Sequence, residues 1–162
     1  MMGMGYPGGA VIDRLARGGD AARYRFPRAW LSRDSADFSF SGLKTALRSF
    51  LASPEGRAAK KEDVAASYQE AIVDVLCGKA LAAAKREGIP RLVLSGGVSA
   101  NSRLRALARE RGAAEGVEVF LPSRALCTDN AAMVALLGER RMSAGSSSGP
   151  ELNAYAASRF SR

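Results

Sequence analysis

Residues 91–101 read Arg-Leu-Val-Leu-Ser-Gly-Gly-Val-Ser-Ala-Asn. Apolar residues 92–94 lead directly into Ser95, Gly96 and Gly97, and a helical pattern rich in Ala and Arg follows. This order predicts a strand that ends in a glycine turn, before a helix N-terminus whose unpaired N–H groups suit phosphate or another anion. An ordinary strand-to-helix turn with a tight glycine bend explains the same stretch equally well.

The neighbouring segments predict an α/β arrangement. Residues 102–113 form a predicted helix with Leu104 and Leu107 facing inward, and residues 117–121 read as a second strand. A strand, a helix and a strand in that order favour parallel pairing. The longest helical pattern covers residues 61–87 and ends at Gly88 and Pro90. We expect that helix to pack against the sheet and to contribute no chemistry.

The N-terminal third contains a glycine-rich turn and two further patterns. Residues 5–9 (GYPGG) predict a turn that leads into a short helix, with Asp13 as a solvated carboxylate in its first turns. The alternation of Phe and Ser over residues 38–41 predicts a short strand, after which Ser41 can cap a helix. Lys44 is expected on the surface of that helix, since the stretch lacks the spacing of a phosphate-binding Walker motif.

Residues 20–36 look irregular and combine arginines with aromatic residues. Arg23, Arg25, Arg28 and Arg33 alternate there with Tyr24, Phe26 and Trp30. Arginine beside aromatic rings suits phosphate contact and base stacking on a nucleic acid. A surface loop whose aromatic side chains turn into the core explains the pattern at least as well.

Composition limits the functional classes. The chain has 162 residues, 24 basic against 16 acidic residues, a net charge of +8 and no histidine. The charge favours an acidic partner such as nucleic acid, and any imidazole chemistry must come from another chain. Two cysteines fifty positions apart predict reduced thiols. No apolar run is long enough to cross a bilayer and the start does not resemble a signal peptide, so we expect no membrane partner and a cytoplasmic location.

A second polar cluster lies at residues 126–134 (LCTDNAAMV). Thr128 or Asp129 can cap the helix that follows, and the apolar character of that helix predicts that it is buried. Asp129 is also placed to bind a metal or a ligand, although a cap is the commoner use of the pattern. Residues 143–149 are typical of a linker.

Four short blocks in this order resemble the tRNA adenosine threonylcarbamoyltransferases, enzymes of the actin-like ATPase fold. The blocks are residues 5–9 (GYPGG), 37–44 (DFSFSGLK), 95–101 (SGGVSAN) and 127–133 (CTDNAAM). The resemblance implies an α/β fold: an incomplete actin-like ATPase (ribonuclease-H-like) lobe with a helical insertion. It divides the chain into residues 1–142, the C-terminal half of such a domain, and residues 143–162, a weakly ordered tail.

The resemblance also implies a site. Family members bind ATP or threonylcarbamoyl-adenylate and transfer the threonylcarbamoyl group to adenosine 37 of tRNA. Gly9 then matches the glycine that approaches the nucleotide, Asp13 a carboxylate that contacts its sugar, and Asn101 the asparagine that binds the adenylate. Gly96 and Gly97 would let the backbone approach the nucleotide closely, and Asp129 would be one ligand of an iron or similar ion. No residue is assigned as catalytic.

The departures from the family matter as much. Its other metal ligands are a His-x-x-x-His pair, and this sequence has no histidine. We therefore expect the N-terminal half to act in trans if the gene is split, alongside tRNA and the partner subunits of the modification complex, and we expect no transferase activity from this chain alone. Two alternatives stay open: a non-catalytic scaffold that binds nucleotide or tRNA, and a carbamoyltransferase of this fold with another substrate.

Overall fold

The structure is a computed structural model that describes residues 5, 7–30 and 35–153. These residues form six α-helices, two short 3₁₀ helices and one two-stranded parallel sheet, which confirms the α/β class. The chain divides into two compact units, residues 1–128 and residues 129–162. In the part of the chain that the structure describes, no helix has both the length and the apolar character needed to cross a membrane.

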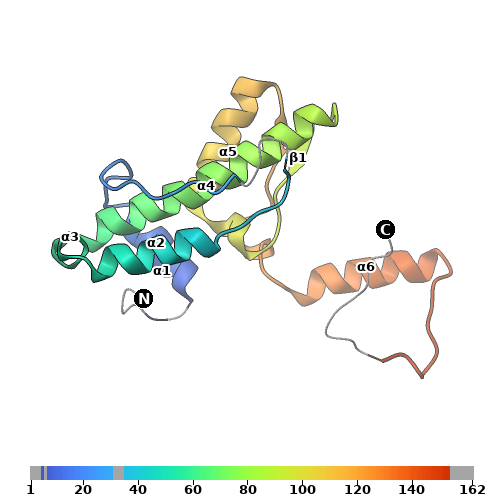
Figure 1. Ribbon diagram of the computed structural model, residues 1–162. Helices are drawn as coiled ribbons and strands as arrows, with labels where there is room; N and C mark the ends of the chain where they lie inside the picture. Colours follow the sequence, from blue (N-terminus) through green and yellow to red (C-terminus); the bar gives the residue numbers. More distant parts are fainter. Residues whose placement is uncertain (1–4, 6, 31–34, 154–162) are drawn as a thin grey trace. The chain divides into compact units, whose positions relative to one another are not determined.

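Helix α4, Lys61–Arg86, is the longest element, and the first unit is built along it (Figure 1). Its acidic first turn and basic last turn both complement the helix dipole. Helix α1, Gly8–Ala16, packs against α4, as do α5, Ser102–Glu115, and the first strand. Because neighbours surround it, α4 buries thirteen of its residues and has almost no polar face over much of its length.

One apolar cluster joins α4 to helix α2, Ser41–Ala52. Leu43 and Leu47 of α2 pack there with Val64, Tyr68 and Ala71 of α4. Helix α3, Pro54–Ala58, follows α2 directly, with Ser53 as its cap. The predicted cap of α2 is wrong, because the helix begins at Ser41 and no side chain caps it.

The loop before α2 differs from two predictions. Residues 37–40 form no strand, and the rings of Phe38 and Phe40 stack on each other with centroids 6.3 Å apart. Phe26 is buried and packs edge-on with Phe50, with ring centroids 5.6 Å apart. Tyr24 is half-buried, and its ring is tilted against Phe50 at 4.8 Å. The core explanation of the arginine-aromatic loop therefore holds for these two side chains; Arg33 lies outside the described residues.

A buried lysine holds this loop against α4. Lys79 donates hydrogen bonds from Nζ to the carbonyl oxygens of Ser35 and Asp37, and its ammonium group lies over the rings of Trp30 and Phe38. The Trp30 ring lies so close to α4 that a Cβ on Gly78 would meet it at 2.5 Å. Lys79 and Gly78 thus place Trp30 and residues 35–38 against α4.

The sheet consists of β1, Arg91–Val93, and β2, Glu118–Phe120, which pair in parallel with Leu92 opposite Val119. Leu92 and Val119 face the apolar clusters that α4 and α5 complete. Gly116 ends α5 with φ = 71°, a left-handed conformation that suits glycine. The predicted order of strand, helix and strand is confirmed.

The second unit contains helix α6, Ala131–Ser143. Its cap is Asn130, whose side chain accepts a hydrogen bond from the backbone N–H of Met133 at 3.0 Å, so the prediction of Thr128 or Asp129 is wrong. The predicted burial is also wrong, because no residue of α6 is buried and Val134 is 65% exposed.

Both cysteines are free and buried, which agrees with the predicted reduced thiols. Burial raises the pKa of the Cys77 thiol to about 11, with smaller effects from nearby charges. Cys77 therefore behaves as a small apolar side chain of the core near Leu104.

Asp74 joins the irregular loop to α5, and it supplies a pH test of the fold. It forms ion pairs with Arg28 and Arg111. Burial alone would raise the pKa of Asp74, but hydrogen bonds from Arg111 and Arg28 outweigh burial and lower the pKa. A lowered pKa gives stability that is complete above the unfolded-state pKa, about 3.9, and that is lost as pH falls through the folded-state pKa.

We therefore expect Asp74→Asn to lower the free energy of unfolding by about 1 kcal/mol at pH 7, because the ion pairs are partly solvated. This difference from the unmodified protein should shrink below about pH 4. Urea denaturation between pH 3 and 7 measures it, with Glu118→Gln as a control on an exposed carboxylate. A difference that does not change with pH would contradict the assignment.

Candidate functional site

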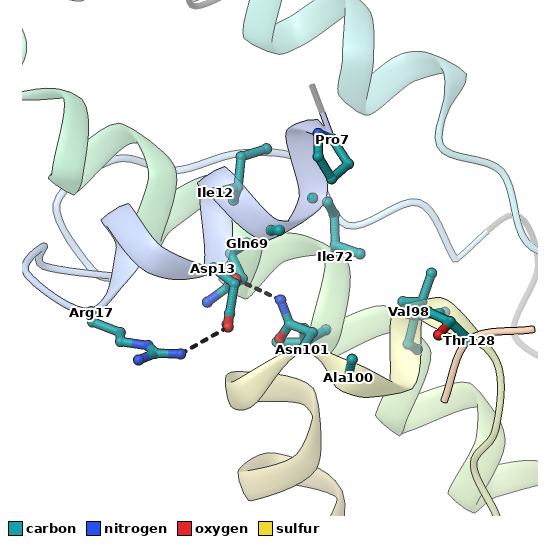
Figure 2. A pocket seen from close by; sticks show the side chains of 15 residues that line it. Pro7, Ile12, Asp13, Arg17, Gln69, Ile72, Val98, Ala100, Asn101 and Thr128 are labelled. Atoms are coloured by element: carbon teal, nitrogen blue, oxygen red, sulfur yellow. Dashed lines mark hydrogen bonds and ion pairs between the residues drawn. The ribbon is translucent and has the colours of Figure 1, made fainter. Parts of the chain in front are cut away.

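The first unit encloses a cavity of about 720 Å³ between α1, the middle of α4 and the start of α5 (Figure 2). This volume is within the range of small-molecule sites. Its polar side chains are few and its walls are mostly apolar, which is the usual composition of such sites. The polar side chains in the lining are Asp13, Arg17, Gln69, Asn101 and Thr128. The apolar lining includes Pro7, Ala10, Ile12, Ile72, Val73, Leu76, Val98 and Ala100.

The structure brings together four of the six residues predicted for the site. Gly9, Asp13, Gly97 and Asn101 all line the cavity, although up to 92 positions separate them in the sequence. Gly96 lies next to the lining and shapes the turn, with φ = 85°. Asp129 belongs to the second unit and is exposed.

The glycines of the lining leave open space. A Cβ added to Gly9 or to Gly97 would meet no atom within 4 Å. Protein packing therefore does not require glycine at these positions, whereas a ligand that approaches the backbone would. At Gly96 the backbone itself requires glycine, since other L-amino acids rarely adopt its positive φ. The tight turn thus accounts for Gly96, and the open space at Gly97 leaves room for a ligand beside the backbone.

The helix N-terminus open to an anion is that of α1 and not that of α5, which corrects the prediction from residues 91–101. A 3₁₀ helix, η1 at Gly97–Ala100, separates the glycines from α5. The first turn of α5 is already occupied: Asp13 accepts from the N–H of Ser102 at 2.9 Å, and Asn101 accepts from the N–H of Leu104 at 2.9 Å. Helix α1, by contrast, has no side-chain cap, and its first-turn residues Gly9 and Ala10 line the cavity.

Asp13 is buried and accepts three hydrogen bonds, so the prediction of a solvated carboxylate is wrong. The residue is 9% exposed. Its Oδ1 accepts hydrogen bonds from both the N–H and the hydroxyl of Ser102, and its Oδ2 accepts one from Arg17 at 3.3 Å. Asp13 thus connects α1 to the start of α5 across the base of the cavity.

Helix α4 contributes more than packing, contrary to prediction. Gln69, Ile72, Val73 and Leu76 form one wall of the cavity. The Gln69 side chain accepts a hydrogen bond from Nδ2 of Asn101 at 2.7 Å. Glu70, the next residue, forms a bidentate ion pair with Arg103, and the hydrogen bonds that Arg103 donates to the Glu70 carboxylate raise the pKa of Arg103.

Arg105 fixes the loop that carries Thr128 to the cavity. Its guanidinium donates to the carbonyl oxygens of Ser99 at 3.0 Å and of Pro122 at 2.7 Å. The Ser99 hydroxyl and Arg105 also contact the buried thiol of Cys127. These bonds join η1 to the chain before and after a second 3₁₀ helix, η2 at Arg124–Leu126.

The described residues do not form a metal centre by themselves. No group of three His, Cys, Asp or Glu side chains within the described ranges could hold a metal ion. The sequence has no histidine, and Asp129 offers a single carboxylate. The donors present in this chain therefore do not by themselves fit an iron site.

The α/β fold carries a glycine-bordered cavity with the size and composition of a small-molecule site. A family model described as tRNA N6-adenosine threonylcarbamoyltransferase matches residues 1–136. The chain belongs to this family. It is 49% identical over 156 residues to the protein of that name from Syntrophotalea carbinolica, 54% over 158 residues to that from Anaeromyxobacter dehalogenans and 48% over 155 residues to that from a Geobacter species.

These matches cover 95% of this chain, so they include part of the segment after residue 143. They cover 46%, 47% and 45% of the three relatives, in their C-terminal part. The chain thus spans a little under half the length of the curated relatives it matches. The resemblance predicted from the four sequence blocks is confirmed.

Proposed function

We propose that this chain forms the nucleotide-binding half of a threonylcarbamoyl transfer site. It would hold ATP or threonylcarbamoyl-adenylate in the cavity while the group moves to adenosine 37 of a tRNA in the cytoplasm. The open space at Gly9 and Gly97, in a cavity that Asn101 also lines, carries the proposal. Family membership supplies the chemistry of the substrate.

Each part of an adenylate finds a suitable surface in the cavity. The apolar wall of Ile72, Val73 and Leu76 on α4 suits a planar base, which gains most from desolvation. The uncapped N-terminus of α1 suits a phosphate oxygen, because its N–H groups and helix dipole favour negative charge. The remaining N–H of the Asn101 amide suits an acceptor atom of the nucleotide that lies between the base and the phosphate.

Asp13 has a more limited role than a free sugar ligand. Its Oδ1 already accepts two hydrogen bonds and its Oδ2 accepts one from Arg17. A carboxylate has about four acceptor positions, so Oδ2 keeps capacity for one ribose hydroxyl. Asp13 would therefore contact the sugar and hold α5 in place at once.

The remaining parts of the site lie in the portion of the relatives that this sequence does not include. We propose that the fold is a lobe of the actin-like type that this portion completes. Asp129 stays a predicted metal ligand, and histidines from that portion would supply the other donors. The basic charge of +8 supports tRNA as the substrate. Partner subunits of the modification complex are expected as well.

Transfer assays test this proposal. The purified chain, given threonylcarbamoyl-adenylate and tRNA, is expected to form no modified tRNA. Addition of the separately expressed N-terminal half of the Anaeromyxobacter dehalogenans relative should restore product. Asn101→Ala should lower the restored rate at least tenfold, by loss of a hydrogen bond to the adenylate; Glu118→Gln serves as the control. Product from the chain alone would refute the half-site.

A further inference from the structure

The chain contains one glutamine, and the fold places it in the cavity wall. Gln69 lies in the middle of α4 and is 6% exposed. A buried amide is costly unless its polar atoms are paired. Here the acceptor oxygen Oε1 takes a hydrogen bond from Nδ2 of Asn101 at 2.7 Å (Figure 2). A leucine would fill the same space without that cost, so packing alone does not account for a glutamine.

The two bonds of the Asn101 side chain fix its amide plane. Oδ1 accepts from the N–H of Leu104 at 2.9 Å and caps α5. That bond alone still lets the amide turn about the axis between Oδ1 and the donor. The second bond, from Nδ2 to Gln69, removes this freedom and leaves the other N–H of Nδ2 on a residue that lines the cavity.

We propose that Gln69 is a positioning residue: it holds the Asn101 amide so that its remaining N–H is directed at an acceptor atom of the bound nucleotide. The inference rests on the proposed nucleotide site and adds a residue to it. Because the orientation is set before the ligand arrives, the ligand does not lose affinity to ordering of the Asn101 side chain. Gln69 itself need not touch the nucleotide.

Side-chain amide NMR tests this directly, because the ¹⁵N-labelled chain has only four carboxamide groups. They belong to Gln69, Asn101, Asn130 and Asn153. The Asn101 pair, identified with an Asn101→Ser variant, is expected to be well separated and to exchange slowly with solvent. Gln69→Leu should move the pair toward the shifts of an exposed asparagine and speed its exchange at least tenfold.

Two further variants separate positioning from packing. Gln69→Glu keeps an acceptor at the same place and should restore the slow exchange of the Asn101 pair. Ile72→Val removes a methyl group from the same wall without touching Asn101, and it should leave the pair unchanged. An Asn101 pair that stays the same in Gln69→Leu, or that is lost equally in Gln69→Glu, would overturn the proposal. Thermal unfolding confirms that each variant is folded.

Titration with ATP distinguishes this inference from the proposed function. In the unmodified chain ATP should shift the Asn101 pair, and Gln69→Leu should weaken the apparent affinity about tenfold, with Ile72→Val close to the unmodified value. Equal affinity in Gln69→Leu and the unmodified chain would overturn the positioning role. If ATP moves no Asn101 signal at any concentration while Gln69 still orders the amide, the nucleotide site fails and the orientation of Asn101 by Gln69 stands.

Discussion

Asp13→Ala is expected to lower the free energy of unfolding of the first unit by about 2–3 kcal/mol, because two part-buried hydrogen-bond donors lose a charged, buried acceptor. Both donors belong to Ser102, the first residue of α5. Their loss releases the contact between α1 and α5 and leaves an orphan N–H at the start of a helix. Nucleotide affinity should fall as well, since both helices border the cavity.

Two matched variants locate the effect. Asp13→Asn retains an oxygen that accepts from Ser102 and should cost about 1 kcal/mol. Arg17→Ala removes the other partner, whose side chain is largely exposed, and should cost no more than about 0.5 kcal/mol. Urea denaturation measures all three. Equal losses in Asp13→Ala and Asp13→Asn would show that the bonds to Ser102 do not hold the two helices together.

Gly19→Ala should be the most damaging single-methyl change in this part of the fold. A Cβ there would overlap the backbone carbonyl of Glu62 and approach the N of Asp63 at 2.7 Å. Backbone at the start of α4 cannot move aside as a side chain can, so we expect a loss of roughly 3 kcal/mol or more. Displacement of α1 from α4 would also carry Asp13 away from Ser102 and weaken nucleotide binding.

Gly18→Ala is the matched control one position earlier. Its Cβ would come no closer than 3.8 Å to any atom, which is ordinary van der Waals contact. The free energy of unfolding should then change by no more than about 0.5 kcal/mol. Circular dichroism during thermal and urea unfolding measures both variants. If Gly18→Ala and Gly19→Ala lower the free energy of unfolding equally, then close packing against the start of α4 is not what requires glycine at position 19.

Local patterns were sufficient to predict the main elements of the fold. The apolar stripe of α4, the apolar run of β1 and the strand that follows α5 all form near the predicted residues. Predictions that depended on one or two residues were less successful. The Phe-Ser alternation at 38–41 is too short to form a strand without a pairing partner, and the rings of Phe38 and Phe40 stack instead. Among three adjacent polar residues, Asn130 and not Thr128 or Asp129 became the cap.

The site residues that belong to short glycine and asparagine motifs could be predicted from the sequence. The residues whose role depends on contacts between distant parts of the chain could not. The partner of Asp13 lies 89 positions away, so no local pattern could show that this carboxylate is buried. Gln69 belongs to a helix that is buried nearly all round, where one polar side chain does not disturb the apolar stripe. The one feature of the sequence that could have indicated a role for Gln69 is that it is the only glutamine of the chain and lies inside such a helix. Arg105 bonds to carbonyl groups that only the fold brings within reach, so no local pattern could reveal its role.

Nucleotide titration followed by backbone amide NMR tests the central claim most directly. ATP added to the chain alone should bind weakly, in roughly the millimolar range, because half of the relatives' length is outside this sequence. The shifted signals should belong to the cavity lining, at Gly9, Gly97 and Asn101, and the N-terminal half of a relative should tighten the binding. Shifts confined to other surfaces, or micromolar binding by the chain alone, would contradict the account of a nucleotide half-site.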